Sequence, residues 1–415
     1  MENLVIIGAG QSAIQCITSL KKEGYLGSIT LVGEEEHLPY QRPPLSKGFL
    51  EDSVNKDRLY FKKLEFFTEN KIQLQLGNTA KRIDTKNRQV FLKDGTDLSY
   101  DKLVFATGSR VRRLDFPGNN LESIHYLRGL DEAESIKEDL KISKDLVVIG
   151  AGYIGLEVAA IAAKNNISVT VVEMANRVMN RTVDPQISEY YLKLHENNGV
   201  QFKFNTSLEE IKGSSKPESV ICSDGSEIKA DTVIIGAGII PNTEIAEEAG
   251  IDCNNGISVD EFGLTSQEDI YACGDCTNHP NKLLGKNLRL ESVHNAMEQA
   301  KTVAGSINGS PSEYNQIPWF WSDQYDHKLQ IVGLSGSHDR VTMRGDTEDT
   351  KFMLFYTQGD ELVAVDSINN PKEFLICRKL VVNKVKIKPE MISDCLLYTS
   401  PSPRDLSTSR MPSSA

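Results

Sequence analysis

Two parts of the chain repeat the same order of apolar and polar positions. Four consecutive aliphatic residues, 4–7 in one part and 146–149 in the other, run directly into a glycine-rich turn. Short, fully apolar runs of this kind are typical of strands buried in a parallel sheet. Beyond each turn, apolar residues recur three or four positions apart, as on one face of a helix. A further apolar strand follows over 28–33 and over 168–173, so the pattern predicts two strand–helix–strand units.

The turn in each unit carries the glycine spacing of dinucleotide-binding proteins. The three fingerprint positions are occupied by Gly8, Gly10 and Ala13 in the first unit, and by Gly150, Gly152 and Gly155 in the second. The first glycine permits a tight turn, the second lets the backbone approach a pyrophosphate, and the third position, where alanine is tolerated, allows close packing. The helix N-terminus then offers N–H groups to the pyrophosphate. One such motif can be a plain turn, but two in register predict two bound dinucleotides.

An acidic residue ends the second strand of each unit, at Glu34 and at Glu173. In the fingerprint, an acid about 20 residues after the glycines accepts hydrogen bonds from a ribose diol. Glu173 would repel a 2′-phosphate, which favours NADH over NADPH as the second dinucleotide. Arg177 and Arg181 follow closely and could hold such a phosphate, so NADPH stays open as an alternative.

Three further segments, 100–108, 231–242 and 270–275, read as apolar strands closed by small residues. The cofactor contacts expected in them are Ala106, Thr107, Gly108, Gly238, Gly274 and Asp275. A carboxylate at a strand end, such as Asp275, can accept a hydrogen bond from a sugar hydroxyl or can cap a helix. The set resembles the two-dinucleotide-binding flavoprotein superfamily. The resemblance implies FAD in the first unit, NAD(P)H in the second, and Asp275 on the ribityl chain of FAD.

Segments 39–47, 152–157 and 318–324 narrow the resemblance. Together they resemble the FAD-dependent NADH:ferredoxin reductases of bacterial oxygenase systems, over about residues 3–394. The first segment contains two adjacent prolines, which are rigid and lack N–H groups, so they can form a fixed apolar wall. The resemblance implies that electrons pass from NADH to a [2Fe–2S] ferredoxin or a rubredoxin.

The resemblance also implies a set of site residues. Lys47 and Glu157 are expected to pair beside the flavin as catalytic residues, because a buried lysine needs an anionic partner and its charge would stabilise reduced flavin. Trp319 and Trp321 are expected to cover the flavin or its edge, with core packing as the alternative. His294 departs from the family pattern, which has proline there, and receives no catalytic role. The other expected cofactor contacts are Ser12, Glu34, Arg42, Pro44, Ala80, Arg128, Tyr153, Ile154, Val293 and Trp321.

The seven cysteines do not form the pattern of a disulfide framework. Flavoprotein disulfide reductases carry a cysteine pair just after the first unit, and related peroxidases carry one cysteine near the same place. Residues 42–47 contain neither. Cys273 and Cys276 have the C-x-x-C spacing of redox and metal motifs, but they overlap the predicted FAD-binding residues. We therefore expect them to be structural and expect no metal site.

The expected fold class is α/β, with two Rossmann-like dinucleotide-binding domains of the glutathione reductase type and a C-terminal α+β domain. The FAD-binding domain is expected to be discontinuous, over 1–112 and 245–318. The NAD-binding domain is expected as the insert, over 113–244, and the C-terminal domain over 319–394.

The C-terminal domain should contain strands over 351–356 and 362–366, where apolar residues are bounded by turns. A helix should follow near 371–381, because proline at its first position is favourable. Residues 395–415 are rich in Ser, Thr and Pro and show no periodicity, which predicts a disordered or non-native tail.

The formal net charge of −12 argues against nucleic-acid binding, which needs an excess of Lys and Arg. The short apolar run at the N-terminus does not have the basic start and length of a signal peptide. No apolar run reaches membrane-spanning length. We expect a cytoplasmic protein, without a membrane or nucleic-acid partner, that is a monomer or a weak homodimer.

The predicted reaction moves a hydride from the nicotinamide of NADH to the flavin over about 3–3.5 Å, where the protein supplies position and charge. A flavin can release its two electrons singly, which suits a ferredoxin that serves a cytochrome P450 or other oxygenase. Two alternatives remain. The first is an enzyme of the same fold that reduces or oxidises a small molecule directly, with oxygen or an ascorbate radical as acceptor. The second is an NADH-sensing redox interaction protein of the apoptosis-inducing factor type.

Overall fold

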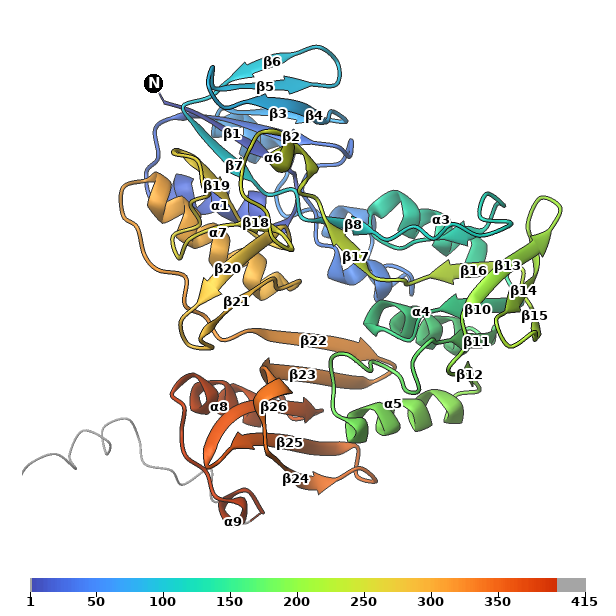
Figure 1. The fold of residues 1–415 in the computed structure, drawn as a ribbon. Coiled ribbons are helices and arrows are strands. Elements are labelled where there is room, and N and C mark those ends of the chain that lie inside the picture. Colours follow the sequence, from blue (N-terminus) through green and yellow to red (C-terminus); the bar gives the residue numbers. More distant parts are fainter. Residues whose placement is uncertain (1, 394–415) are drawn as a thin grey trace, which may run out of the picture. The chain divides into compact units, whose positions relative to one another are not determined.

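A computed structural model describes residues 2–393 of the chain. These residues form two compact units, one that ends at Tyr325 and one that begins at Asp326 (Figure 1). The tail predicted over 395–415 lies outside the described residues, and the predicted domain boundaries stay predictions.

A parallel five-stranded sheet contains the first predicted unit. In order across the sheet, its strands are β19 (Ile270–Ala272), β7 (Lys102–Phe105), β1 (Asn3–Ile7), β2 (Ser28–Gly33) and β3 (Ile72–Leu76). Helices α1 (Gln11–Lys22) and α7 (Val293–Ile307) pack together on one face, where Leu4 and Ile6 are buried. Val5 and Ile7 are buried in a second core on the opposite face. Burial on both faces explains why residues 4–7 of β1 are all apolar.

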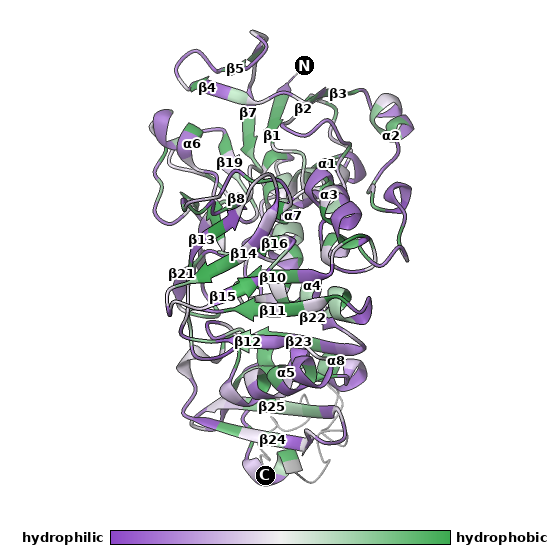
Figure 2. Ribbon diagram, turned by 90° about the vertical axis from the view of Figure 1, so that its right-hand side faces the viewer, coloured by the Kyte–Doolittle hydropathy of each residue, from purple (hydrophilic) through white to green (hydrophobic). Residues whose placement is uncertain are grey.

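A second parallel sheet contains the second predicted unit. In order across the sheet, its strands are β12 (Gln201–Lys203), β11 (Ser168–Val172), β10 (Asp145–Ile149), β16 (Thr232–Ile235) and β9 (Ile124–His125). The helices of this region are α3 (Leu130–Leu140), α4 (Tyr153–Lys164) and α5 (Pro185–Asn197). Figure 2 shows hydrophobic residues along β1, β7, β10 and β11. The strand–helix–strand prediction is confirmed for both units.

Smaller elements complete the compact unit that ends at Tyr325. Its antiparallel strands are β4 (Ala80–Asp84), β5 (Gln89–Leu92), β6 (Asp97–Ser99), β13 (Leu208–Gly213), β14 (Pro217–Cys222), β15 (Glu227–Lys229), β20 (Thr277–Asn281) and β21 (Lys286–Leu288). The remaining short elements are η1 (Pro43–Ser46), η2 (Lys56–Arg58), α2 (Leu64–Glu69), α6 (Glu244–Glu248), β18 (Ile257–Ser258) and β22 (Trp319–Gln324). Strands β8 (Ser109–Val111) and β17 (Ile239–Pro241) pair antiparallel where the chain crosses between the two large sheets (Figure 1). Strand β22 contacts both α4 and α7.

The compact unit that begins at Asp326 contains an antiparallel sheet and short helices. In order across the sheet, its strands are β23 (His327–Gly333), β26 (Glu361–Ile368), β25 (Lys351–Gln358) and β24 (Arg340–Asp346). The helices are η3 (Ser335–Ser337), α8 (Pro371–Val382) and α9 (Pro389–Ser393). Proline occupies the first turn of α8, and the two predicted strands and the predicted helix are confirmed.

Candidate cofactor-binding and active site

A cavity of about 1330 Å³ lies in the compact unit that ends at Tyr325, at the carboxyl ends of β1, β2 and β7. Gly8, Glu34 and Ala106, which directly follow these strands, all line it. Open α/β sheets bind their ligands at this edge. The volume exceeds the roughly 300–1,000 Å³ of ordinary small-molecule sites. The cavity therefore has room for a large ligand such as a dinucleotide.

The glycine turns have the geometry that the fingerprint requires. Gly8 has φ +106°, and a Cβ on it would lie 2.1 Å from the carbonyl oxygen of Ala106. Gly150 has φ +100°, and its Cβ would lie 2.6 Å from the carbonyl oxygen of Gly236. No side chain fits at either position. At Gly10, by contrast, a Cβ would meet nothing within 4 Å, so the backbone faces open space where a pyrophosphate can approach.

The helices that follow these turns begin without a capping side chain. Neither α1 nor α4 has a side-chain cap or an acidic residue in its first turn. Helices α5 and α7, in contrast, are capped by Asp184 and Ser292. The N–H groups at the start of α1 and α4 therefore have no side-chain acceptor, and a bound phosphate would satisfy them. This arrangement fits two dinucleotides, one at each helix.

The two predicted ribose acids differ in their surroundings. Glu34 is exposed and lines the cavity. The Glu173 carboxylate accepts backbone N–H hydrogen bonds from Ala151 and Ala175, each over 2.7 Å, and does not line the cavity. These bonds fix the carboxylate beside the second glycine turn, where it can accept from a diol. Sequence reasoning missed Glu35, which follows Glu34 in an acidic run and binds Arg42 instead.

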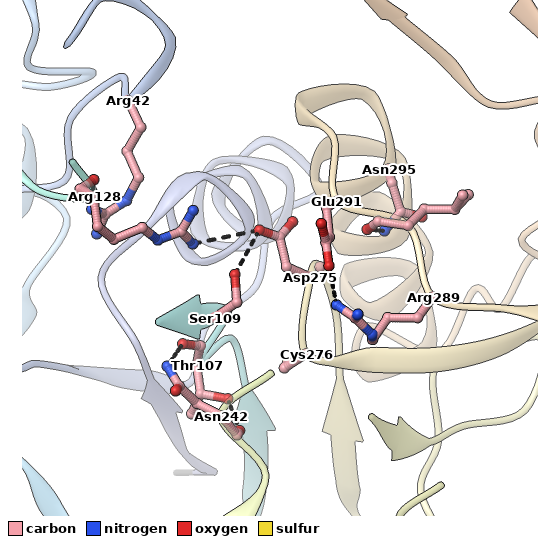
Figure 3. Close-up of polar contacts among 12 residues, drawn as sticks. Arg42, Thr107, Ser109, Arg128, Asn242, Asp275, Cys276, Arg289, Glu291 and Asn295 are labelled. Carbon is pink, nitrogen blue, oxygen red and sulfur yellow. Dashed lines mark hydrogen bonds and ion pairs between the residues drawn. The ribbon is translucent and has the colours of Figure 1, made fainter. Parts of the chain in front are cut away.

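Two arginines and an aspartate meet on one wall of the cavity. Arg128 Nη2 lies 3.4 Å from Asp275 Oδ2, which also accepts from Ser109 Oγ over 3.3 Å (Figure 3). Arg42 donates to Glu35 Oε1 over 2.5 Å and to the carbonyl oxygen of Arg128 over 2.7 Å. Burial and the neighbouring Arg42 lower the pKa of Arg128. The two adjacent guanidinium groups can hold an anionic pyrophosphate.

Lys47 and Glu157 form the predicted ion pair. Lys47 Nζ lies 2.7 Å from Glu157 Oε2, which also accepts from Ser46 Oγ over 2.5 Å. The Ser322 hydroxyl donates to the other carboxylate oxygen over 2.6 Å. Glu157 is only 3% exposed, and its burial raises its pKa, an effect that Lys47 opposes. Lys47, Ser46 and Glu157 all line the cavity, so the pair faces the space that a ligand would occupy.

The aromatic segment on β22 lies at another side of the cavity. The rings of Trp319 and Trp321 stack with centroids 5.4 Å apart, but only Trp321 lines the cavity. Phe320, which sequence reasoning did not single out, lines it as well and packs against Tyr153. The His294 ring lies 5.8 Å from that of Trp319.

Most of the predicted cofactor contacts share the one cavity. Those that line it are Gly8, Gly10, Ser12, Glu34, Arg42, Lys47, Ala80, Ala106, Thr107, Gly108, Arg128, Tyr153, Ile154, Asp275, Val293 and Trp321. Those that do not are Ala13, Pro44, Gly150, Gly152, Gly155, Glu173, Gly238 and Gly274. Ala13 is fully buried under the first turn, and the neighbours Pro43 and Leu45 line the cavity in place of Pro44.

Cys273 and Cys276 are buried, unbridged thiols. Burial raises the pKa of both, so they are protonated and poor nucleophiles. The Cys276 thiol faces the carbonyl oxygens of Phe105 and Cys273, at 3.8 and 3.5 Å. Within 2–393, the structure has no group of three or more His, Cys, Asp or Glu side chains able to hold a metal ion. Over the same residues, it has no helix both long and apolar enough to cross a membrane.

Comparison with known families decides the relationship. The model of the pyridine nucleotide-disulphide oxidoreductase family matches residues 2–300. The chain belongs to this family. A second family model, described as reductase C-terminal, matches residues 319–396. Proteins of the pyridine nucleotide-disulphide oxidoreductase type contain FAD and use NADH, which confirms the predicted cofactors and the predicted α/β fold class.

Three similar proteins are reductases. Rhodocoxin reductase from Rhodococcus erythropolis is 40% identical over 393 residues, covering 94% of this chain and 92% of the relative. The ferredoxin reductase for the CYP199A2 system from Rhodopseudomonas palustris has a TM-score of 0.93 at 39% identity, over 96% of this chain and 98% of that one. The reductase in the covalent putidaredoxin reductase–putidaredoxin complex has a TM-score of 0.92 at 39% identity, over 95% and 96%. The prediction of an oxidoreductase of the ferredoxin reductase type is confirmed.

Proposed function

We propose that this protein passes electrons from NADH through FAD to a [2Fe–2S] ferredoxin that serves a cytochrome P450 or another oxygenase. The observation that carries the proposal is the lining of the cavity, which contains no cysteine among the described residues. A flavoprotein that reduces disulfides needs a thiol pair beside its flavin. Without one, electrons must leave to a separate acceptor, and similar reductases are named for small electron carriers.

The cavity wall supports an assignment of FAD to the first glycine turn. The start of α1 would bind the pyrophosphate together with Arg42 and Arg128. Asp275 would accept a hydrogen bond from the ribityl chain, and Glu34 from the ribose. The remaining contacts that we propose for FAD are Gly8, Gly10, Ser12, Ala13, Pro44, Ala80, Ala106, Thr107, Gly108, Gly274, Val293 and Trp321.

We assign NADH to the second glycine turn, at the start of α4. Glu173, fixed by two backbone N–H groups, would accept from the ribose diol and would repel a 2′-phosphate. The other contacts that we propose for NADH are Gly150, Gly152, Tyr153, Ile154, Gly155 and Gly238. In domain terms, residues 1–112 and 245–318 would bind FAD, 113–244 would bind NADH, and 319–394 would form the C-terminal domain.

Lys47 and Glu157 would provide electrostatic stabilisation where the two cofactors meet. Bound FAD would supply the redox chemistry, taking two electrons as a hydride and returning them singly. The Lys47 ammonium would stabilise the negative charge that appears on reduction. Glu157 would keep that ammonium in place.

Steady-state NADH oxidation by FAD-loaded protein tests the proposal, with and without a [2Fe–2S] ferredoxin and with cytochrome c as the reporter. We expect a large rise in cytochrome c reduction when the ferredoxin is added. No rise with several ferredoxins, together with fast oxygen consumption, would reject the electron-carrier function in favour of a direct oxidase. A rise with rubredoxin alone would change the partner and keep the reaction.

We also propose that the enzyme works in the cytoplasm as a monomer or a weak homodimer, without nucleic-acid or membrane partners. Sedimentation over a range of protein concentrations tests the oligomeric state. A tight dimer at the lowest concentration would contradict it.

A further inference from the structure

A series of buried hydrogen bonds leads away from Glu157 to a histidine outside the proposed reaction. Ser322 Oγ donates to Glu157 Oε1 over 2.6 Å, and Gln324 Nε2 donates to Ser322 Oγ over 3.2 Å. His195 Nε2 lies 2.9 Å from Gln324 Oε1, and the Tyr325 hydroxyl lies 3.3 Å from His195 Nδ1. We call Ser322, Gln324 and His195 the donor series. All three are at most 1% exposed, so water cannot replace these bonds.

Three elements bring the donor series together. Ser322 and Gln324 alternate along β22, so their side chains point to the same side of the strand. Glu157 projects from α4 and His195 from α5. Phe320, two residues before Ser322, packs on the first turn of α4 and extends the same row. One side of β22 is therefore joined to both helices.

The hydrogens of the donor series can point in only one direction when Glu157 is ionised. A carboxylate only accepts, so the single hydroxyl hydrogen of Ser322 points to Glu157. Ser322 Oγ must then accept from Gln324, which places the amide nitrogen toward Ser322 and the amide oxygen toward His195. The reversed amide would bring two oxygens together without a hydrogen between them. His195 therefore carries its hydrogen on Nε2, and every donor points toward Glu157.

The protonation states of the outer groups agree with this direction. Burial lowers the pKa of His195 to about 4, so the ring is neutral near pH 7 and Nδ1 can accept. Burial raises the pKa of Tyr325, so its hydroxyl keeps its proton and can donate to Nδ1. Burial raises the pKa of Glu157 as well, and the hydrogen bond from Ser322 opposes that rise. Aligned hydrogen bonds of this kind strengthen one another.

We propose that Ser322, Gln324 and His195 are positioning residues that hold Glu157 as an anion and so keep the Lys47 ammonium in place beside the flavin. The inference rests on the proposed function, because it assigns the flavin to the cavity that Lys47 lines. If a donor is lost, the Glu157 carboxylate is less stabilised as an anion and holds the Lys47 ammonium less firmly. The negative charge of a reduced flavin is then less stabilised, so the flavin becomes harder to reduce.

Four single variants and one double variant of the FAD-loaded enzyme test the donor series. Ser322→Ala removes the donor nearest to Glu157, and His195→Phe removes the most distant member. His195→Gln keeps an N–H donor that can reach Gln324, so it is the conservative rescue. Ser188→Ala is the matched control, because Ser188 is also buried, lies in α5 with His195, and donates to the carbonyl oxygen of Val178 outside the donor series.

The readout is the midpoint potential of bound FAD, measured spectroelectrochemically without any ferredoxin. Ser322→Ala is expected to lower the ratio of reduced to oxidised flavin about tenfold at a fixed potential, a shift of about 30 mV to more negative values. His195→Phe is expected to lower the ratio about threefold. His195→Gln and Ser188→Ala are expected to keep the wild-type potential. In the Ser322→Ala background, His195→Phe should add no further shift, because the connection to Glu157 is already cut.

An unchanged potential in Ser322→Ala would overturn the inference, and so would additive shifts in the double variant. FAD content is measured for each variant, and Ser322→Ala alone decides the question if His195→Phe does not fold. Failure of the proposed function is separate. If the wild-type enzyme reduces none of the ferredoxins but the variants still show the expected shifts in potential, the ferredoxin partner is rejected and the role of the donor series is retained.

Discussion

Replacing Glu157 with glutamine tests how strongly the buried ion pair supports the fold. Glu157 is 3% exposed and accepts from Lys47, Ser46 and Ser322. Glutamine keeps the shape but removes the charge, and it leaves the Lys47 ammonium without a counter-ion. Breaking a buried pair costs about 3–5 kcal/mol. The Lys47 side chain is 20% exposed and can turn toward water in the cavity, so we expect a smaller loss, about 2–3 kcal/mol.

Urea unfolding of the FAD-loaded variants, followed by flavin fluorescence, measures this loss. Lys47→Met and the double variant Lys47→Met/Glu157→Gln complete a double-mutant cycle. Because the double variant leaves no buried charge unpaired, it should cost at least about 1 kcal/mol less than the sum of the single variants. A Glu157→Gln cost below about 1 kcal/mol, or additive costs, would refute the idea that the two groups stabilise each other.

Single substitutions at three other positions test the cofactor assignments and the pH dependence of stability. Gly8→Ala should abolish FAD binding, read as lost flavin absorbance, because its Cβ would lie 2.1 Å from the Ala106 carbonyl oxygen. Glu173→Ala should raise the kcat/KM ratio of NADPH to NADH at least about tenfold, since a repulsive charge and a diol acceptor are lost; an unchanged ratio would place the ribose elsewhere. Burial lowers the pKa of His195 and His279 to about 4, whereas the unfolded value is near 6.5. The unfolded chain therefore takes up protons first, and stability should fall as pH drops from 6.5 toward 4, by up to about 3 kcal/mol per histidine. His195→Gln should flatten this fall in urea titrations at pH 7 and 4.5, and an equal fall in the variant would contradict the assignment.

The sequence predicts the two sheets well because their determinants are local. A run of aliphatic residues such as 4–7 has one stable environment, a strand covered on both faces. The glycine that follows is equally constrained, since Gly8 adopts φ +106° against a neighbouring carbonyl group. The pairing of β19 with β7 is not local, and only the resemblance to a known family indicated that the late segment 270–275 belongs to the first unit.

Side-chain partners are the part that sequence patterns could not predict. Ser46 and Ser322 reach Glu157 from 111 and 165 residues away in the chain. Nothing in the residue types distinguishes these serines from surface serines. The resemblance supplied the pairing of Lys47 with Glu157, but it did not indicate the hydroxyl groups that complete the site.

Strand β22 shows what the two-residue alternation of side chains along a strand can reveal. Its tryptophans are rare residues and draw attention, and Trp321 does line the cavity. The polar residues that follow them carry a different signal, because Ser322 and Gln324 fall on the opposite side of an alternating strand from the tryptophans. Both are buried, at 0% and 1% exposure. A buried polar side chain needs a hydrogen-bond partner, so two of them in alternation predict a polar surface on the element packed against the strand. The alternation is visible in the sequence, but the burial that makes a partner necessary comes from the structure, which identifies the partners as Glu157 on α4 and His195 on α5.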